Sequence, residues 1–245
     1  MDFKNKTAVI TGAAVGIGRA VALQLAQRGA NVVLVDYNPD SLRETEREVR
    51  EITGNVIAIT CDVSDNAKVL ETVQTTVARF GKIDILVNNA ALWRCWSSLE
   101  ETPIHEWKQY IDVNVMGTVY FTKAVISQMI AGGFGRIINV SSVAGVYGKA
   151  NMVHYSTTKG AVIAFTKALA KEVAGDGVTV NAVSPGSVSP SEERNIDYYE
   201  QSDLAFMGRT GTNRENADLI CFLASEKAGY ISGQNIQIDG CRMKL

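Results

Sequence analysis

Short apolar runs alternate with longer segments of helical periodicity along the whole chain. Because runs that are apolar on both alternating faces are typical of strands buried on both sides, they indicate a parallel sheet covered by helices. We therefore predict an α/β protein with seven parallel strands. The runs cover residues 8–10, 32–35, 56–59, 83–87, 137–140, 178–183 and 236–238.

The segments between these runs carry helix-start and helix-stop signals. Ser41 and Glu44 have the spacing of a capping box, and Gly29 and Gly81 stand where glycines end helices. Strands that alternate with helices imply right-handed crossovers and therefore a doubly wound sheet. No repeat or linker divides the chain, so we expect a single domain over residues 1–245, with a substrate loop at about 185–209.

Composition and charge narrow the classes of function. The chain has 24 Lys and Arg against 26 Asp and Glu, with no block of one sign, which argues against nucleic-acid binding. No apolar stretch reaches the length of a membrane span, and no export signal is expected. The cysteine spacing fits neither a zinc site nor a redox pair, so we expect no metal and reduced thiols in the cytoplasm. The four cysteines are Cys61, Cys95, Cys221 and Cys241.

A glycine-rich turn, TGAAVGIGR, follows the first run and leads into a helix. Its glycines permit a tight turn, and the amides of the helix N-terminus can approach a pyrophosphate. Asp36 ends the second run, where a carboxylate accepts both ribose hydroxyls of an adenosine and repels a 2′-phosphate. Neither Val15 nor Tyr37 supplies a cation for that phosphate, so the pattern favours NAD over NADP. Taken singly, an ordinary glycine-rich turn and a solvated strand-end carboxylate remain alternatives.

Further polar groups are expected at the same end of the sheet, after the third and fourth runs. The residues predicted to contact the cofactor from these turns are Gly12, Val15, Gly16, Ile17, Gly18, Asp36, Tyr37, Asp62, Val63, Asn89 and Ala90.

Tyr155 and Lys159 are four residues apart, so they lie on one face of the helix predicted after the fifth strand. A neighbouring ammonium favours the phenolate and lowers the pKa of a phenol, which makes it an efficient acid and base near neutral pH. Ser141 and Ser142 follow the fifth run and are close enough in sequence for a hydroxyl to return beside the phenol. A surface Tyr–Lys pair is the alternative interpretation.

In this order and spacing, these motifs resemble those of the classical short-chain dehydrogenases/reductases over the whole chain. The resemblance implies a Rossmann fold, a nicotinamide cofactor and hydride exchange between the nicotinamide ring and an alcohol or carbonyl carbon. It also implies a homotetramer or homodimer. The motifs are Thr11-Gly12-x-x-x-Gly16-x-Gly18, Asn88-Asn89-Ala90, Asn114, Ser142, Tyr155-x-x-x-Lys159 and Pro185-Gly186.

The resemblance also implies a role for each catalytic residue. Tyr155 would be the general acid and base on the substrate oxygen, and Ser142, with Ser141 as the fallback, would hold that oxygen. Lys159 would bind the nicotinamide ribose, and Asn114 would position a water for proton transfer. On the last strands, the predicted cofactor contacts are Pro185, Gly186 and Val188.

Three positions depart from the family pattern. Ala91 stands where a glycine is usual, and Cys241 stands where a second glycine is common. Pro190 stands where many members have a threonine that binds the carboxamide of the cofactor. Ser187, Ser189 or the backbone would have to replace that contact.

The substrate side is less constrained by sequence. Cations in this set can bind a carboxylate, phosphate or sulfonate, unless they are ordinary surface charges. Residues 191–200 form either a lid that orders on binding or a solvated loop. The residues predicted to face the substrate are Trp93, Arg94, Tyr147, Lys149, His154 and Arg194.

We therefore expect an NAD-dependent alcohol dehydrogenase or carbonyl reductase. It would interconvert a secondary alcohol and a ketone on a small polar substrate such as a sugar, polyol or hydroxy acid. A 3-oxoacyl-thioester reductase is the enzymatic alternative, and Asp36 argues against it because such relatives usually prefer NADPH. A non-catalytic NAD-binding regulator is the alternative from another class, and the presence of the four catalytic residue types argues against it.

Overall fold

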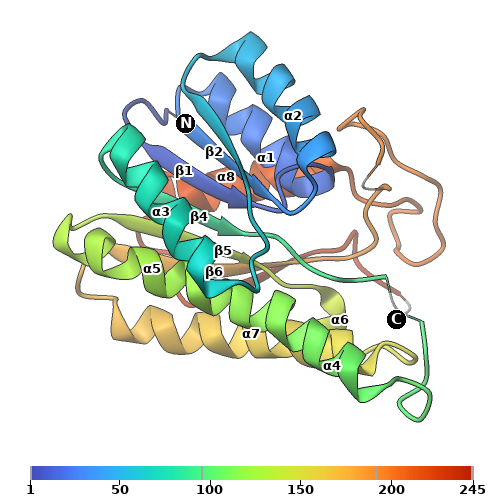
Figure 1. Ribbon diagram of the computed structural model, residues 1–245. Helices are drawn as coiled ribbons and strands as arrows, with labels where there is room; N and C mark the ends of the chain where they lie inside the picture. The colour runs from blue at the N-terminus through green and yellow to red at the C-terminus, as the bar shows by residue number, and fades with distance from the viewer. Residues whose placement is uncertain (1, 95, 191, 244–245) are drawn as a thin grey trace.

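The computed structural model contains one sheet of seven parallel strands in the order β3-β2-β1-β4-β5-β6-β7 (Figure 1). It describes residues 2–94, 96–190 and 192–243, so Cys95 and Ser191 lie outside the described residues. The prediction of a doubly wound parallel sheet is confirmed. The strands are β1 (Thr7–Thr11), β2 (Asn31–Asp36), β3 (Val56–Thr60), β4 (Ile85–Asn88), β5 (Gly135–Val140), β6 (Val178–Pro185) and β7 (Asn235–Ile238).

Helices cover both faces of the sheet. One face is covered by α1 (Gly16–Gln27), α2 (Pro39–Ile52) and α8 (Asn213–Ala224), and the other by α3 (Asn66–Phe80), α5 (Gly117–Ala131) and α7 (Val153–Glu172). The shorter helices α4 (Ile104–Ile111) and α6 (Val143–Tyr147) lie against α7. Short helical turns, η1 (Asp112–Met116) and η2 (Glu226–Ala228), complete the order.

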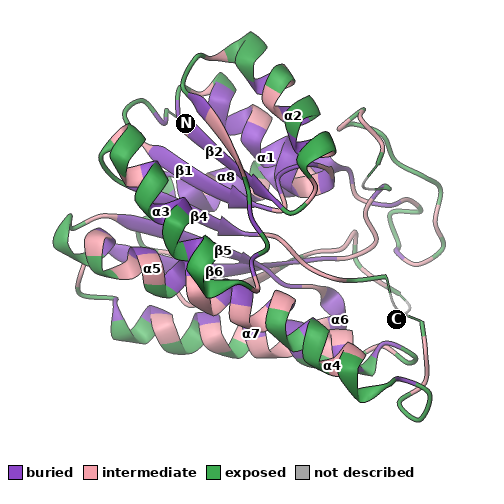
Figure 2. Ribbon diagram, viewed as in Figure 1, coloured by how far each residue is buried: buried purple, intermediate pink, exposed green. Residues whose placement is uncertain are grey.

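The sheet separates two apolar cores, and its central strands β1, β4, β5 and β6 are buried along their length, whereas the edge strands β3 and β7 are partly exposed (Figure 2). Successive side chains of a strand point to opposite faces. Ile10 of β1 accordingly packs under α1 and α8, while its neighbour Val9 packs against the helices of the opposite face. This double burial explains why the strand sequences lack polar alternation.

Helix α2 begins earlier than its sequence pattern predicts. The Asn38 side chain accepts hydrogen bonds from the amides of Asp40 and Ser41, and Pro39 occupies the first helical position. The Ser41 capping box is therefore not the start of the helix. Asn38 is the better cap because proline at the first position needs no amide partner and an Asn side chain satisfies the next two amides.

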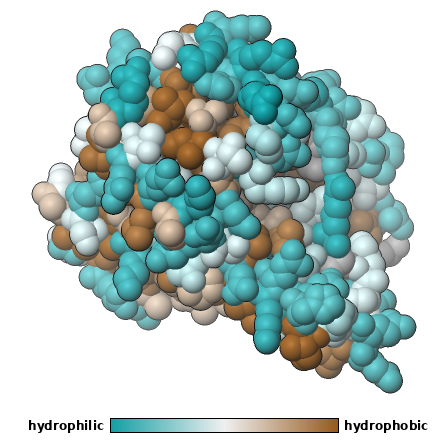
Figure 3. Space-filling view, viewed as in Figure 1, coloured by the Kyte–Doolittle hydropathy of each residue, from teal (hydrophilic) through white to brown (hydrophobic). Residues whose placement is uncertain are grey.

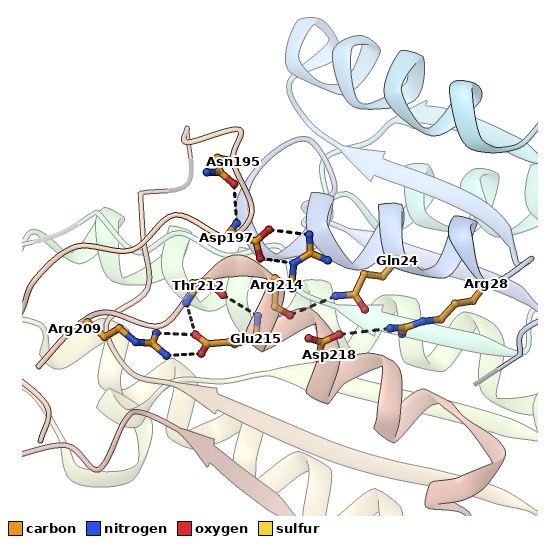
Figure 4. A network of polar contacts seen from close by, with 9 residues as sticks. All are labelled: Gln24, Arg28, Asn195, Asp197, Arg209, Thr212, Arg214, Glu215 and Asp218. Carbon is orange, nitrogen blue, oxygen red and sulfur yellow. Dashed lines mark hydrogen bonds and ion pairs between the residues drawn. The ribbon is translucent and has the colours of Figure 1, made fainter. Parts of the chain in front are cut away.

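The segment after β6 runs from Gly186 to Thr212 without a regular helix among its described residues. Ion pairs anchor its far end: Asp197 binds Arg214 in the first turn of α8, and Arg209 binds Glu215 (Figure 4). Thr212 and Glu215 form a capping box at the start of α8. These contacts attach the segment to the first turn of α8, although the segment contributes little to either core.

The face drawn in Figure 3 is mainly hydrophilic, with apolar side chains gathered in smaller patches. Among the described residues, no helix is long and apolar enough to cross a membrane.

Candidate active site

The turn after β1 leaves no room for side chains at its glycines. A Cβ at Gly18 would lie 2.1 Å from the carbonyl oxygen of Gly12 and 2.6 Å from Nδ2 of Asn89. Gly12 itself has a φ of +64°, which favours glycine. The backbone can therefore pass close to a ligand at this point.

The N-terminus of α1 is open to an anion. Val15 occupies the cap position and makes no side-chain cap hydrogen bond, and the first turn contains no acidic residue. Amides of a helix N-terminus and the helix dipole attract a phosphate in such a position. The turn and the helix start together fit a pyrophosphate.

Asn89 ties the end of β4 to the glycine turn. Its Nδ2 donates to the carbonyl oxygens of Thr11 and Gly12, each at 3.0 Å. The Oγ1 of Thr11 in turn accepts from the amides of Asn89 and Ala90. The Asn89 side chain thus fixes the shape of the turn, a role that sequence spacing does not reveal.

Asp36 lies at the end of β2 and is largely buried. Its two carboxylate oxygens accept from the amides of Ala14 and Asn38, each at 3.0 Å. Burial raises the pKa of this carboxyl, and the backbone hydrogen bonds partly oppose that effect. The neighbouring Tyr37 is exposed. At the end of β3, Asp62 is exposed and accepts from Ser64.

Lys159 is buried beside Tyr155 on α7. Its Nζ donates to the carbonyl oxygen of Val140 at 2.7 Å and lies 5.9 Å from the centre of the Tyr155 ring. Removal from water lowers the pKa of the ammonium to about 8. The two side chains therefore lie on the same face of α7, as their spacing predicts.

Asn114 lies in the π-helical turn η1, which joins α4 to α5. Its side chain accepts from the amide of Leu92 at 2.7 Å and donates to the carbonyl oxygen of Leu92 and to Oγ1 of Thr158. Asn114 therefore links the chain after β4 to helix α7, which carries Tyr155 and Lys159. A π-turn inside a helix often occurs at a functional position.

The two serines after β5 have different environments. The Ser141 hydroxyl is buried and donates to the carbonyl oxygen of Lys159 at 2.8 Å. Ser142 caps α6 through the amide of Ala144 and faces a pocket that it shares with Tyr155. The geometry therefore favours Ser142 over Ser141 as the residue that meets a substrate. The pocket is lined by Ser142, Val143, Ala144, Lys149, Met152, Tyr155, Gly186, Ser187 and Arg242.

Comparison with known proteins identifies the family of this site. A family model described as short chain dehydrogenase matches residues 6–199. The chain belongs to the short-chain dehydrogenases.

Two relatives and one solved structure illustrate the range of this family. The chain is 38% identical over 243 residues to the 3-oxoacyl-(acyl-carrier-protein) reductase FabG of Thermotoga maritima, covering 98% of each protein. It is 35% identical over 246 residues to the 2-dehydro-3-deoxy-L-rhamnonate dehydrogenase (NAD(+)) of a Sphingomonas species, covering 98% of this chain and 96% of the relative. An NAD+-bound xylitol dehydrogenase superposes with a TM-score of 0.91 at 33% identity, covering 98% of this chain and 100% of that one. The protein is therefore an oxidoreductase of the short-chain type with a nucleotide cofactor.

Tyr155 and Lys159, which are also predicted to contact the cofactor, lie on α7. The other residues predicted to hold the cofactor lie in or shortly after strands at one edge of the sheet, or at the start of α1. After β6, Gly186 packs against Asp239, where a Cβ would lie 2.9 Å from the Asp239 Cα. Val188 pairs with Gly211 across the base of the loop. The hydroxyl of Ser189 is buried and has no hydrogen-bond partner among the described residues, so it is available for the contact that Pro190 cannot make.

Two residues predicted to face the substrate lie elsewhere. His154 is fully buried against α4, with Nε2 3.3 Å from Glu106 Oε1 and its ring edge-on to Tyr110. Arg194 pairs with Glu44 and Glu48 of α2, on the other side of the loop. Neither side chain lines the pocket. Each pairs instead with glutamate side chains on a helix that is distant in sequence.

Of the remaining substrate candidates, only Lys149 is among the described residues that line the pocket. Arg94 is exposed and pairs with Glu192 while lying over the Trp93 ring. The Tyr147 hydroxyl accepts from Gln237. No cluster of metal-ligating side chains occurs among the described residues.

Sequence reasoning missed Arg242, which lies after β7 and lines the pocket beside Ser187. No local motif marks this residue, since the pairing of β7 with β6 brings the C-terminal segment to the end of the sheet where the pocket lies.

Proposed function

We propose that this short-chain dehydrogenase interconverts a secondary alcohol and a ketone on a small polar substrate, with NAD(H) as its cofactor. One observation carries the proposal: Ser142 and Tyr155 face the same small pocket, while the buried Lys159 ammonium lies beside the Tyr155 ring. This arrangement supplies a hydrogen-bond donor and a proton-transfer group to one substrate oxygen.

Tyr155 acts as the general acid and base in this proposal, and Ser142 holds the substrate oxygen. With a pKa of about 8, Lys159 is mostly protonated at neutral pH, and its charge favours the phenolate of Tyr155. Asn114 links α7 to the loop after β4, and its Oδ1, which accepts one hydrogen bond from the amide of Leu92, retains a second lone pair for the proposed relay water.

The residues present fit a dinucleotide. The amides at the start of α1 would hold the pyrophosphate, Asp36 the adenosine ribose, and Lys159 the nicotinamide ribose. The nicotinamide ring supplies the hydride chemistry, and the protein supplies orientation and the proton. We propose NAD rather than NADP because Asp36 is followed by the uncharged Tyr37 and would repel a 2′-phosphate.

A 3-oxoacyl-thioester reductase is the second candidate function. It is favoured by the similarity to the Thermotoga maritima reductase, which covers nearly the whole chain. The two candidates differ in the substrate that the pocket must accept and in the expected cofactor.

We also propose that the enzyme is a homotetramer or homodimer, as the family resemblance implies.

A substrate panel tests the proposal. Purified enzyme would be supplied with NAD+ and sugars, polyols, hydroxy acids or cyclic alcohols, and NADH formation would be followed; reduction of a 3-oxoacyl thioester would be measured with NADH and NADPH. Turnover of a small polar alcohol with NAD+ supports the proposed function. Turnover of the thioester alone, with NADPH preferred, would establish the second candidate, and NAD binding without any turnover would indicate a regulator.

A further inference from the structure

Two cationic side chains, Lys149 and Arg242, line the pocket that contains Ser142 and Tyr155. Apart from Tyr155, the other described residues of the lining are apolar, glycine or serine, so this lining includes no carboxylate to balance the two charges. Positive charge that is partly removed from water is unfavourable unless an anion pairs with it.

Arg242 reaches the pocket because the C-terminal segment is attached to the substrate loop. Arg242 forms a backbone bridge with Ala205, and the amide of Met243 donates to the carbonyl oxygen of Leu204. The guanidinium therefore lies at the end of β6, where its Nη1 donates to Oγ of Ser187 at 3.2 Å.

The opposite edge of this guanidinium is the one that carries Nε. Nε of Arg242 is buried and makes no hydrogen bond to any of the described residues. A buried donor without a partner is unfavourable and often marks the position of a ligand. The Nε edge of arginine is also the edge that presents two parallel N–H groups, which match the two oxygens of a carboxylate.

Lys149 provides the second positive charge. Its Nζ lies 4.3 Å from the centre of the Trp96 ring, and an ammonium in such a ring contact can still donate hydrogen bonds to an anion. Burial lowers the pKa of Lys149, and the charge of Arg242 lowers it further, so the two cations sense each other. An anion bound between the two cations would offset both the loss of hydration and the repulsion between their charges.

We propose that Arg242 and Lys149 bind a carboxylate of the substrate, so that the enzyme acts on a short hydroxy acid and the corresponding oxo acid. The proposal rests on the proposed function, since it requires Tyr155 to act on a substrate oxygen in the same pocket. A thioester substrate would present a neutral carbonyl near these cations and leave them unpaired. Because the two cations and Tyr155 line the same pocket, a bound carboxylate would lie within a few bonds of the reacting carbon.

The test compares short 2- and 3-hydroxy acids with their methyl esters, each assayed with NAD+ on the wild type, Arg242→Gln, Arg242→Lys and Lys149→Met. Lys123→Gln, which changes an exposed lysine of α5, is the matched control. The wild type is expected to prefer an acid over its ester by at least about tenfold in kcat/KM, through KM, because a hydrogen bond to a charged group contributes that much. Arg242→Gln should reduce this preference to near unity, and Arg242→Lys should restore part of it. Raising the salt concentration should raise KM for the acid and leave KM for the ester unchanged.

A binding readout separates this proposal from the proposed function. Thermal stabilisation of the enzyme–NADH complex would be measured with the oxo acids and their esters, which requires no turnover. Stabilisation by the acid that is lost in Arg242→Gln supports the carboxylate site even if no alcohol is oxidised, an outcome that would refute only the proposed function. Equal use of acid and ester by the wild type, or an equal loss for both in Arg242→Gln with NADH binding unchanged, would overturn the carboxylate assignment.

Discussion

At the scale of single residues, Lys159 has opposing effects on function and stability. The ammonium proposed to favour the Tyr155 phenolate is buried, and among the described residues its Nζ has one hydrogen-bond acceptor, the carbonyl oxygen of Val140. Its pKa of about 8 means that the folded state disfavours the charged form relative to the unfolded chain, whose lysines titrate near 10.5. The proposed catalytic role of Lys159 therefore requires a charged form that burial in the folded state disfavours.

Replacing Lys159 by methionine tests this conflict. Between pH 8 and 10.5 the unfolded chain retains a proton that the folded chain has released, so the free energy of unfolding of the wild type should rise with pH in that window. The difference between the folded and unfolded pKa corresponds to a rise of about 3 kcal/mol across that window. Denaturant melts should show this rise in the wild type and in the control Lys123→Met, but not in Lys159→Met. The same slope in all three proteins would contradict the depressed pKa.

The two serines and Tyr155 give a second prediction at this scale. Tyr155→Phe removes the proposed proton donor and should lower kcat by about a hundredfold or more while NADH still binds. Ser142→Ala should lower kcat strongly, whereas Ser141→Ala should act mainly on stability because its hydroxyl binds the Lys159 carbonyl oxygen. Steady-state kinetics and thermal melts distinguish the effects, and full activity in Ser142→Ala with none in Ser141→Ala would exchange the two roles.

At the scale of elements, sequence patterns predicted the features that depend on residues close together in the chain. The seven strands followed from their apolar runs, and the glycine turn followed from its spacing. The start of α2 was misplaced by the prediction, because Asn38 and Pro39 are a stronger start than the Ser41 pattern. His154, Arg194 and Arg242 could not be placed from sequence, since their partners belong to helices or strands that only the tertiary fold brings near.

The loop after β6 shows how such contacts alter an expectation. Arg194 was expected to meet the substrate, but it joins the loop to α2, and Arg19 of α1 donates to its backbone carbonyl oxygen while also pairing with Glu48. These ion pairs restrain a segment whose composition alone indicates mobility.

Arg194→Ala should therefore loosen the loop without weakening substrate binding. Hydrogen exchange across residues 192–198 should speed up by about threefold to tenfold, because partly exposed ion pairs contribute roughly 1 kcal/mol. KM for the substrate should stay within about twofold of the wild-type value. The control is Arg47→Ala, which changes an exposed arginine on α2, the helix that carries the partners of Arg194, and it should leave KM equally unchanged. A selective rise in KM with unchanged exchange would return Arg194 to the substrate site.

At the scale of the whole molecule, the parallel sheet brings the chemistry together. Residues after β1, β2, β4, β5 and β6 are far apart in sequence, yet they share the edge where the strands end (Figure 1). Ligands of doubly wound sheets bind at this edge. The loop after β6 and the C-terminal segment close the same edge, so one end of the molecule contains the proposed cofactor site, catalytic residues and substrate contacts.

The measurement that tests the account most directly is the cofactor preference of the turnover reaction. We expect kcat/KM with NAD(H) to exceed that with NADP(H) by at least about tenfold, since a 2′-phosphate beside the Asp36 carboxylate costs more than roughly 1.4 kcal/mol. Asp36→Ala combined with Tyr37→Arg should shift the preference toward NADP(H), and Tyr155→Phe should abolish turnover with both. Equal use of the two cofactors by the wild type, or a preference for NADPH that the double variant leaves unchanged, would contradict the account.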